Sequence, residues 1–494
     1  MSAVLGIDVG TTGVKVILLG PEGSVLDEAS SEHDLSSPKA GWAEEDPHAW
    51  WRGVTSATRQ IMQRHDPAEI EAVGVSGMVP ALILLDEQDH PIRPSIQQND
   101  ARATREISYF QEHYDEAELF QQSGATWNQQ VIAPKLRWLQ DNEPDAWRRM
   151  RRLTGSYEYI AMRLTGQAYV EANWALESGM WSAINGEWID DLLDLAGIHR
   201  GHLAEVRRPE EVIGQVTSAA ASSTGLAEGT KVIAGSADHI AAALAAGLTR
   251  PGEAVLKFGG AGDFLYVVHE FTPIKELFID YHDLPGRFVL NGCMATSGSL
   301  IKWFRDRFRP DTNYAALDAE AAFLAPGSDG IIVLPYFLGE KTPVHDPFAR
   351  GTIIGLTLTD TPAHLYRALL EGVSYAFKHH VDVLEAAGHT IDRYYVMDGG
   401  ARSSLWREIT ASVLGREVNF IEGSHAGSAY GVAYIAGVAA QLWEWDAIRT
   451  WIRTATTTEP DSAATVRYRD LYSVYRETYR RLKDLYPRLE VGGE

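Results

Sequence analysis

The chain has 494 residues, of which 45% are hydrophobic and 22% are charged, and it carries a formal net charge of −23. This length predicts about two to four domains, because a single hydrophobic core stops growing at roughly 250–300 residues. The acidic balance argues against a nucleic-acid-binding surface, which needs clustered lysine and arginine. Cys293 is the only cysteine, which excludes an intrachain disulfide and a thiolate zinc cluster.

The sequence predicts neither a membrane span nor a secretion signal. The apolar stretch Ile240–Leu248 is far shorter than the ~18 residues that a bilayer requires. The chain enters a predicted strand by Val4, without the basic and apolar segments of a signal peptide. We therefore expect a cytoplasmic protein with no membrane partner.

Residues 4–19 predict a β-hairpin with a phosphate-binding turn. Two apolar runs, Val4–Ile7 and Val14–Leu19, flank a centre rich in glycine, threonine and aspartate. Gly10 and Gly13 allow close backbone approach, and Asp8 is the residue type that holds hydrated Mg²⁺ beside phosphates. Further hydrogen-bond donors are available at Thr11, Thr12 and Lys15. The alternative is an ordinary hairpin whose turn is polar.

The first half continues as alternating helices and strands. The pattern predicts a helix that ends near Arg64, strands at Ile70–Gly77 and Ala81–Leu85, helices through roughly 101–165, a strand at Lys231–Ala234 and a helix at 237–246. A turn-rich segment, Thr249–Gly252, follows. We predict a domain boundary there, which divides the chain into residues 1–248 and 249–494.

The second half opens as the first does. Glu253–Val268 is again strand, glycine turn and strand, which predicts a duplicated architecture with a ligand between the copies. Later elements are a strand at Ile331–Phe337, a helix at Pro362–Leu384, a strand at Tyr394–Met397 and a charged helix at Tyr468–Leu489 outside the core. Gly399 and Gly400 stand between a strand and a helix, where a nucleotide can lie against the helix N-terminus. A plain strand-to-helix turn is the alternative.

Two common nucleotide motifs are missing from the sequence. There is no G-x-x-x-x-G-K-[ST] phosphate loop, and Gly6, Gly10 and Gly13 do not make the G-x-G-x-x-G of a dinucleotide fold. The paired glycine hairpins therefore favour a two-domain nucleotide clamp.

Four segments in this order resemble the FGGY carbohydrate kinases of the actin-like ATPase superfamily over nearly the whole chain. They are the first phosphate motif Gly6–Lys15, the catalytic segment Ala234–His239, the second phosphate loop Leu256–Gly262 and the adenosine loop Asp398–Ser404. Two signature regions are present in imperfect form, at Lys135–Asn142 and at Gly351–Leu356 with His364–Gly372. The resemblance implies an α/β fold of two actin-like (ribonuclease H-like) domains with an ATP and sugar cleft between them. Residues 1–248 would bind sugar and carry the first hairpin, and residues 249–494 would bind nucleotide.

Within that family the xylulose kinases are the most similar by motif. Trp42–Trp51 and Gly339–Pro343 resemble their segments. Three departures fall where sugar should bind: Met78–Pro80 replaces Met-His-Gly, Gln98 replaces Trp, and His239 replaces Asn. In the second phosphate loop, Gly260 and Ala261 stand where Thr-Ser is common.

The resemblance implies ATP-dependent phosphorylation of a sugar hydroxyl, with D-xylulose to D-xylulose 5-phosphate as the favoured reaction. The alternatives are a kinase for another ketose or polyol (ribulose, erythritol or glycerol) and a non-catalytic actin-like sugar- and ATP-binding regulator. A regulator would usually carry an extra DNA-binding or peptide-binding domain, which this sequence does not predict. The preferred sugar, the hydroxyl phosphorylated and the oligomeric state, with a homodimer as one alternative, stay open here.

The resemblance also implies a role for each site residue. Asp238 would be the catalytic base and Asp8 would hold Mg²⁺. ATP would be bound by Thr11, Thr12, Lys15, Gly259, Gly260, Gly399, Gly400 and Ser403. The sugar would be bound by Met78, Asn99, Asp100, Gln130 and His239.

Three of these residues have an ordinary structural alternative. Asp238 could be a helix N-cap, Asp100 could form a salt bridge with Arg102, and His239 could be a satisfied residue at a helix start. If His239 faces the cleft instead, it could donate to a substrate hydroxyl.

Overall fold

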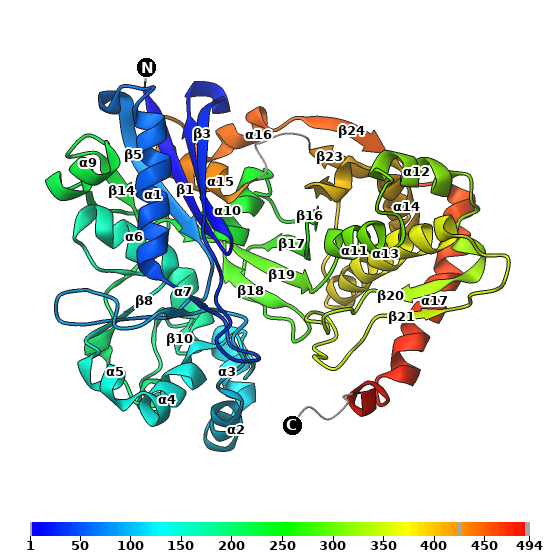
Figure 1. Ribbon diagram of the computed structural model, residues 1–494, viewed down its shortest axis with the longest axis horizontal. Helices are drawn as coiled ribbons and strands as arrows, with labels where there is room; N and C mark the ends of the chain where they lie inside the picture. Colours follow the sequence, from blue (N-terminus) through cyan, green and yellow to red (C-terminus); the bar gives the residue numbers. More distant parts are fainter. Residues whose placement is uncertain (1, 422–426, 490–494) are drawn as a thin grey trace.

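The computed structural model describes residues 2–421 and 427–489, which form two seven-stranded sheets with helices packed on them (Figure 1). The first sheet has the order β13 (Val212–Gln215), β14 (Lys231–Ile233), β5 (Ile70–Gly77), β1 (Ala3–Gly10), β2 (Gly13–Leu19) and β3 (Val25–Glu32), and β15 (Ser236–Ala237) also pairs with β5. The second has the order β18 (Phe278–Tyr281), β19 (Phe288–Met294), β17 (Gly262–Val268), β16 (Glu253–Phe258), β22 (Arg393–Met397), β23 (Val418–Ile421) and β24 (Thr454–Thr458).

The two sheets repeat one arrangement, as the paired hairpins predict. In the first sheet β1 is antiparallel to β2 and parallel to β5. In the second sheet β16 is antiparallel to β17 and parallel to β22. Each sheet therefore places a glycine turn at the same end of an equivalent hairpin.

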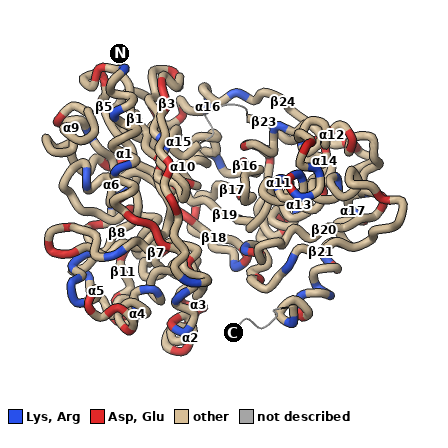
Figure 2. The backbone as a smooth tube through the Cα atoms, in the orientation of Figure 1, with Lys and Arg blue, Asp and Glu red and all other residues tan. Residues whose placement is uncertain are grey.

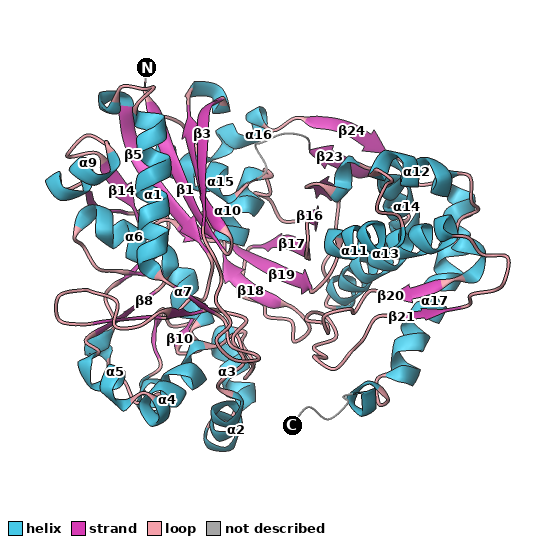
Figure 3. Ribbon diagram, viewed as in Figure 1, coloured by secondary structure: helices cyan, strands magenta, loops and turns pink. Residues whose placement is uncertain are grey.

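Helices cover both sheets and fill the connections (Figure 3). In the first half they are α1 (Pro47–Met62), α2 (Thr104–His113), α3 (Glu116–Ser123), α4 (Ile132–Asn142), α5 (Pro144–Arg149), α6 (Ser156–Thr165), α7 (Ala172–Glu177), α8 (Asp190–Leu195), α9 (Ser218–Thr224) and α10 (Asp238–Ala245). In the second half they are α11 (Gly298–Phe308), α12 (Tyr314–Ala322), α13 (Pro362–Ala386), α14 (Ser404–Leu414), α15 (Ser428–Ala439), α16 (Ile448–Trp451) and α17 (Ser462–Leu482).

Short strands complete the connections. They are β4 (Glu44–Glu45), β6 (Ile83–Leu85), β7 (Ser95–Ile96), β8 (Arg152–Thr154), β9 (Val170–Glu171), β10 (Trp181–Ser182), β11 (Glu187–Trp188), β12 (Val206–Arg207), β20 (Ile332–Leu334) and β21 (Thr352–Ile354). None of the helices in the described ranges is both long and apolar enough to cross a membrane. Acidic and basic residues are spread over both halves (Figure 2).

Strand β1 is buried on both faces, which explains why Val4–Ile7 reads as a nearly continuous apolar run. Helix α1 packs against the sheet on one side, and α10 and α15 pack on the side turned toward the second sheet (Figure 1). Helix α15 lies between β23 and β24 of the second sheet in the chain, but it joins a core with Val4 and Ala72 of the first sheet. The predicted division at 248 and 249 therefore separates the two sheets, while part of the second segment packs on the first.

The C-terminal helix differs from its prediction. It begins at Ser462 rather than Tyr468, and it is not outside the core, because Tyr468, Leu471 and Tyr475 are buried in the second hydrophobic cluster. The hydroxyl groups of Tyr475 and Tyr336 lie 2.8 Å apart. The charged residues that suggested an outer helix occupy only its exposed face.

The two halves are tied together where β18 meets α7. The side chain of Asn173 in α7 donates to the carbonyl of Tyr281 at 3.0 Å and accepts from its N–H at 2.7 Å. Close by, Ser236 donates to Oδ1 of Asp283 at 2.6 Å, and the carboxyl group of Asp283 is fully buried. Burial, and secondarily the charge of Glu171, raises the pKa of Asp283 to about 8.

Replacing Gly6 should weaken the contact between β1 and α15. A Cβ atom on Gly6 would lie 2.0 Å from the carbonyl oxygen of Ala429 and 2.8 Å from Cβ of Ala433. We expect Gly6→Ala to lower the free energy of unfolding by about 1–3 kcal/mol, as overpacking does. Urea denaturation would measure this, with Gly10→Ala as the control because its nearest atom is 3.4 Å away. Equal stability of the two variants would contradict the prediction.

The buried carboxyl of Asp283 should make stability depend on pH. The pKa of Asp283 is raised from 3.8 to about 8. Its contribution to the free energy of unfolding is therefore fully present below pH 3.8 and is lost as the pH rises through 8. Asp283→Asn keeps an acceptor for Ser236 and removes the ionisation. We compare the free energy of unfolding of this variant with that of the unsubstituted protein. Between pH 5 and pH 9 we expect the difference to shift in favour of the variant by about 2 kcal/mol or more. Denaturation at both pH values tests this, and a difference that is independent of pH would be inconsistent with it.

Candidate active site

Two adjoining cavities lie between the halves. The larger, of about 350 Å³, is lined from the first half by residues that include Val79, Gln98, Gln130, Glu177, Asp238 and His239, and from the second by Lys257, Asp263, Asp280 and Asn291. The smaller, of about 240 Å³, is lined by residues that include Asp8, Lys15, Lys257, Asp398, Gly427 and Ser428. Lys257 and Ser428 line both cavities, so the two spaces meet at these side chains.

Asp238 is the first residue of α10, and its carboxylate faces the larger cavity. Its Oδ1 accepts the backbone N–H of His239 at 2.6 Å, and about a third of the side chain (35%) is exposed. The N-cap position belongs to Ala237 instead, so the alternative role of Asp238 as N-cap is not the one observed.

Asp8 lies in β1 directly opposite Lys15 of β2. Ser76 donates to its Oδ1 at 2.8 Å. Burial first, and the charge of Asp238 second, raise the pKa of Asp8 to about 7. Burial likewise raises the pKa of Asp398, which faces the same smaller cavity and has a positive φ of 73°. Two half-buried carboxylates in one cavity fit the few protein ligands that Mg²⁺ takes beside phosphates.

The turn of the first hairpin is open to solvent. Gly10 pairs with Gly13, which leaves Thr11 and Thr12 exposed between them. Lys15 lines the smaller cavity, and its ammonium group lies 3.1 Å from the carboxylate of Glu28. Lys15 is thus brought to the phosphate side of the cleft, and ATP contacts by the two threonines stay predictions.

The second hairpin presents backbone rather than side chains. The carbonyls of Gly259 and Gly260 accept from the N–H groups of Gly298 and Ser297 at 2.7 and 2.9 Å. A Cβ atom on Gly260 would meet nothing within 4 Å, so the turn has open space above it. The second turn can therefore approach a phosphate closely.

The loop predicted to bind adenosine is partly occupied by structural contacts. A Cβ atom on Gly400 would lie 2.6 Å from the ring of Trp406, and Ser403 caps α14 by accepting the N–H of Trp406 at 3.0 Å. Gly399 has open space around it. Adenosine contacts by these three residues stay predictions.

The predicted sugar contacts fall into two groups. Gln130 and His239 line the larger cavity, and Gln130 donates to Gln98 at 3.2 Å. Met78 is buried beside the cavity, and its carbonyl accepts from Ser156 at 2.7 Å while its neighbour Val79 forms the lining. Asn99 is exposed and is not part of the lining.

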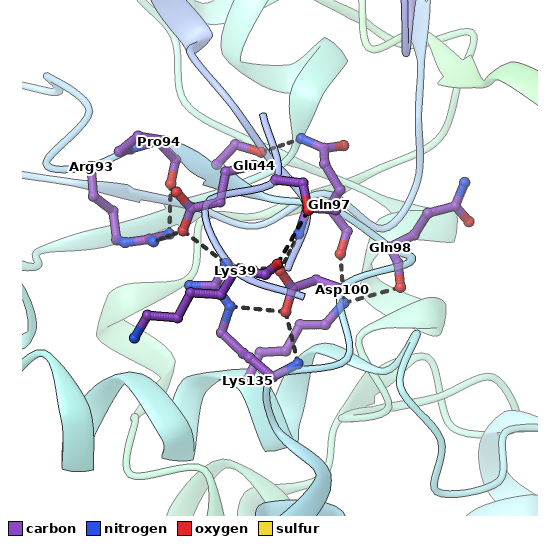
Figure 4. Close-up of polar contacts among 12 residues, drawn as sticks. Lys39, Glu44, Arg93, Pro94, Gln97, Gln98, Asp100 and Lys135 are labelled. Atoms are coloured by element: carbon purple, nitrogen blue, oxygen red, sulfur yellow. Dashed lines mark hydrogen bonds and ion pairs between the residues drawn. The ribbon is translucent and has the colours of Figure 1, made fainter. Parts of the chain in front are cut away.

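Asp100 belongs to a buried layer of charged and polar side chains (Figure 4). Its carboxylate accepts from the guanidinium group of Arg102 at 2.8 Å and from the N–H of Ala43 at 2.6 Å. The ammonium group of Lys135 donates to the carbonyls of Gln97 at 2.8 Å and Gln98 at 3.2 Å. The salt bridge that was the alternative for Asp100 is therefore present, and this layer supports the loop that carries Gln98.

Comparison with models of known protein families identifies the family of this chain. Residues 3–245 match the N-terminal domain of the FGGY family of carbohydrate kinases, and residues 266–440 match its C-terminal domain. The chain belongs to this family. The predicted family, fold class and enzyme class are thereby confirmed, and the chain is a carbohydrate kinase that uses ATP.

Several relatives of this FGGY kinase match it over nearly its whole length. The xylulose kinase of Escherichia coli (strain K12) is 30% identical over 438 residues, which are 88% of this chain and 90% of that protein. The crystal structure of xylulose kinase from Rhodospirillum rubrum is 40% identical with a TM-score of 0.92, covering 98% of this chain and 99% of that one. The gluconokinase of Bacillus subtilis (strain 168) is 26% identical over 502 residues, 99% of this chain and 98% of that protein.

The structure adds cleft residues that the sequence patterns did not indicate. Glu177 ends α7, and Asp280 and Asn291 come from β18 and β19. Nothing local in the sequence marks these three, because the elements meet only in the folded kinase. Lys257 and Asp263 could have been found, since they flank the second glycine turn and the hairpin register pairs them.

Proposed function

We propose that this kinase phosphorylates D-xylulose to D-xylulose 5-phosphate at the expense of ATP. The observation that carries the proposal is the position of Asp238, whose carboxylate faces a sugar-sized cavity that adjoins a second, lysine-lined cavity. The 40% identity to the xylulose kinase from Rhodospirillum rubrum over almost the whole chain supports this sugar.

In this proposal each cavity binds a different substrate. The sugar occupies the larger one, with Asp238 beside the reacting hydroxyl, and the terminal phosphates of ATP occupy the smaller one. Lys15, Thr11 and Thr12 approach these phosphates from the first hairpin, and Gly259 and Gly260 approach from the second. Gly399, Gly400 and Ser403 border the adenosine.

Asp8 and Asp398 would hold Mg²⁺, which neutralises phosphate charge when bound. The sugar hydroxyl gives its proton to the carboxylate of Asp238 while its oxygen bonds to the γ-phosphorus, and the bond from that phosphorus to the β,γ-bridging oxygen breaks to release ADP. Little covalent work falls to the protein, so its contribution is alignment and charge neutralisation.

The polar groups at the far end of the larger cavity favour an uncharged sugar. Oε1 of Glu177 and Oδ1 of Asn291 are buried and have no hydrogen-bond partner within the described residues. Asn291 is oriented by its amide nitrogen, which lies 3.5 Å from Oδ2 of Asp280. A sugar hydroxyl can satisfy either atom, whereas a sugar carboxylate set against Oδ1 of Asn291 would bring no proton to it.

The electrostatics of the same end oppose a sugar carboxylate. Burial first, and then the charges of Asp280 and Asp238, raise the pKa of Glu177 well above its ordinary value. The carboxylates of Asp280 and Asp238, which contribute to this shift, also repel an anionic substrate. These contacts support a ketose or polyol rather than the acidic sugar named by the gluconokinase relative.

His239 is placed to serve this end of the cavity. Its Nε2 lies 3.2 Å from Oδ2 of Asp280, and its Nδ1 lies 3.4 Å from Oδ1 of Asp238. Burial disfavours the charged ring, but these two carboxylates raise the pKa of His239 above its ordinary value. We propose that the ring holds the carboxylates of Asp238 and Asp280 in place, because each of its nitrogens faces one of them.

Removing the base should abolish turnover without removing ATP binding. We expect Asp238→Asn to lower kcat by about 10²–10⁴-fold, the usual contribution of a general base, while the affinity for ADP stays within about 3-fold. Kinase assays and calorimetric titration with ADP test this. Asp141→Asn, at an exposed residue of α4, is the control. Normal turnover in Asp238→Asn would rule out the base assignment.

The substrate is tested by ADP release over a panel of D-xylulose, D-ribulose, erythritol, glycerol and D-gluconate. We expect D-xylulose to give the highest kcat/KM and gluconate to fall roughly 100-fold or more below it, because like charges in a buried site cost several kcal/mol. A better neutral substrate would replace D-xylulose in the proposal. Preference for gluconate would contradict the argument from Glu177 and Asn291, and no sugar-dependent ADP release would favour a regulator.

A further inference from the structure

Lys257 occupies the junction between the sugar cavity and the phosphate cavity. It lies in β16, one residue before Phe258 ends the strand, and its side chain lines both spaces. The side chain is only 18% exposed. Among the described residues that line both cavities, it is the one that carries charge.

Carboxylates from both halves surround the ammonium group of Lys257. Asp263 lies 3.0 Å away on the neighbouring strand. Although burial disfavours a charged amine, the charges of Asp263 and Asp398 outweigh it and raise the pKa of Lys257. The charge of Lys257 in turn stabilises the ionised forms of Asp8 and Asp398. A permanent positive charge is therefore fixed where the two substrates must meet.

The turn that follows offers no side-chain donor of its own. Residues 259–261 are Gly259, Gly260 and Ala261, which carry neither hydroxyl groups nor charge. Backbone N–H groups can approach a phosphate there, but only Lys257 adds a cation to this hairpin beside the cavities. The first hairpin has the mirror arrangement, because its acid, Asp8, precedes the turn and its lysine, Lys15, follows it.

We propose that Lys257 is a catalytic residue of this kinase, whose ammonium group contacts the phosphoryl group during its transfer from ATP to the sugar hydroxyl. The charge on that group spreads over its three equatorial oxygens as it moves, and a fixed cation in a water-poor cleft stabilises this state most. The lysine stays protonated throughout, so the proton and bond changes of the reaction are unaltered. This inference rests on the phosphoryl-transfer reaction and not on which sugar accepts the group.

The competing explanation is that Lys257 serves only as the ion-pair partner of Asp263. The register pairs the two residues across the hairpin, so such a structural role is chemically reasonable. The two explanations differ in one respect. A structural partner becomes unnecessary when Asp263 is neutralised, whereas a phosphoryl ligand does not.

The experiment compares steady-state kinetics of four variants with the sugar that the unsubstituted enzyme uses best. We expect Lys257→Met to lower kcat by about 10²–10³-fold, as loss of a charge-stabilising donor does, with the KM for sugar within about 3-fold. Lys257→Arg keeps the charge and should recover kcat to within about 10-fold. The double variant Lys257→Met/Asp263→Asn also neutralises the carboxylate that forms the ion pair with Lys257, and it should stay as slow as the single variant.

Lys302→Met is the matched control, since it removes an exposed lysine of α11 and should leave kcat and KM unchanged. Thermal unfolding of each variant checks that it is folded, and the double variant provides the test if Lys257→Met is not. Recovery of kcat in the double variant would show an ion-pair role and overturn the proposal. So would a rise in sugar KM at unchanged kcat. Because the sugar is taken from the panel, an error about D-xylulose would leave this result intact.

Discussion

The electrostatics of the cleft are dominated by carboxylates that both halves contribute to it. Asp8 and Asp238 come from the first half, and Asp263 and Asp398 come from the second. Desolvation makes ionised carboxylates costly there, and the raised pKa values of Asp8 and Asp398 express that cost. Lys257 offsets part of it from the centre. The rest is available to be offset by the Mg²⁺ that the proposed function places beside Asp8 and Asp398, so the protein alone is poised for a cation.

Duplication of the fold explains how this charge is arranged. Each sheet carries a hairpin that ends in a glycine turn, and each hairpin pairs one aspartate with one lysine across its strands. In the first hairpin the aspartate precedes the turn, and in the second the lysine does. Because the aspartate and the lysine occur in opposite order along the two hairpins, Asp8 and Lys257 lie close enough for their charges to interact. One architecture therefore supplies both the carboxylate proposed to bind Mg²⁺ and the lysine proposed to contact the phosphoryl group.

The sequence predicted the parts of this site that depend on local patterns. Apolar runs interrupted by glycine leave few alternative structures. They predicted both hairpins, the helix that begins at Asp238 and the cleft between two similar halves. The return of α15 to the first sheet was not predictable, because an apolar helix does not show which sheet it will cover. Asp100 illustrates the same limit within a motif, since only the fold reveals that Arg102 and Ala43 occupy its carboxylate.

Sugar recognition was the least predictable part for a related reason. Glu177 and Asp280 lie on α7 and β18, the two elements that join the halves through Asn173 and Tyr281. They come together only after both halves have folded and docked, so their spacing in the sequence does not predict that they meet. In the proposed function, a sugar that contacts both side chains would bridge the halves at their junction. The choice of sugar could then change through α7 and β18, while the roles proposed for Asp8, Asp238 and Lys257 in phosphoryl transfer stay the same.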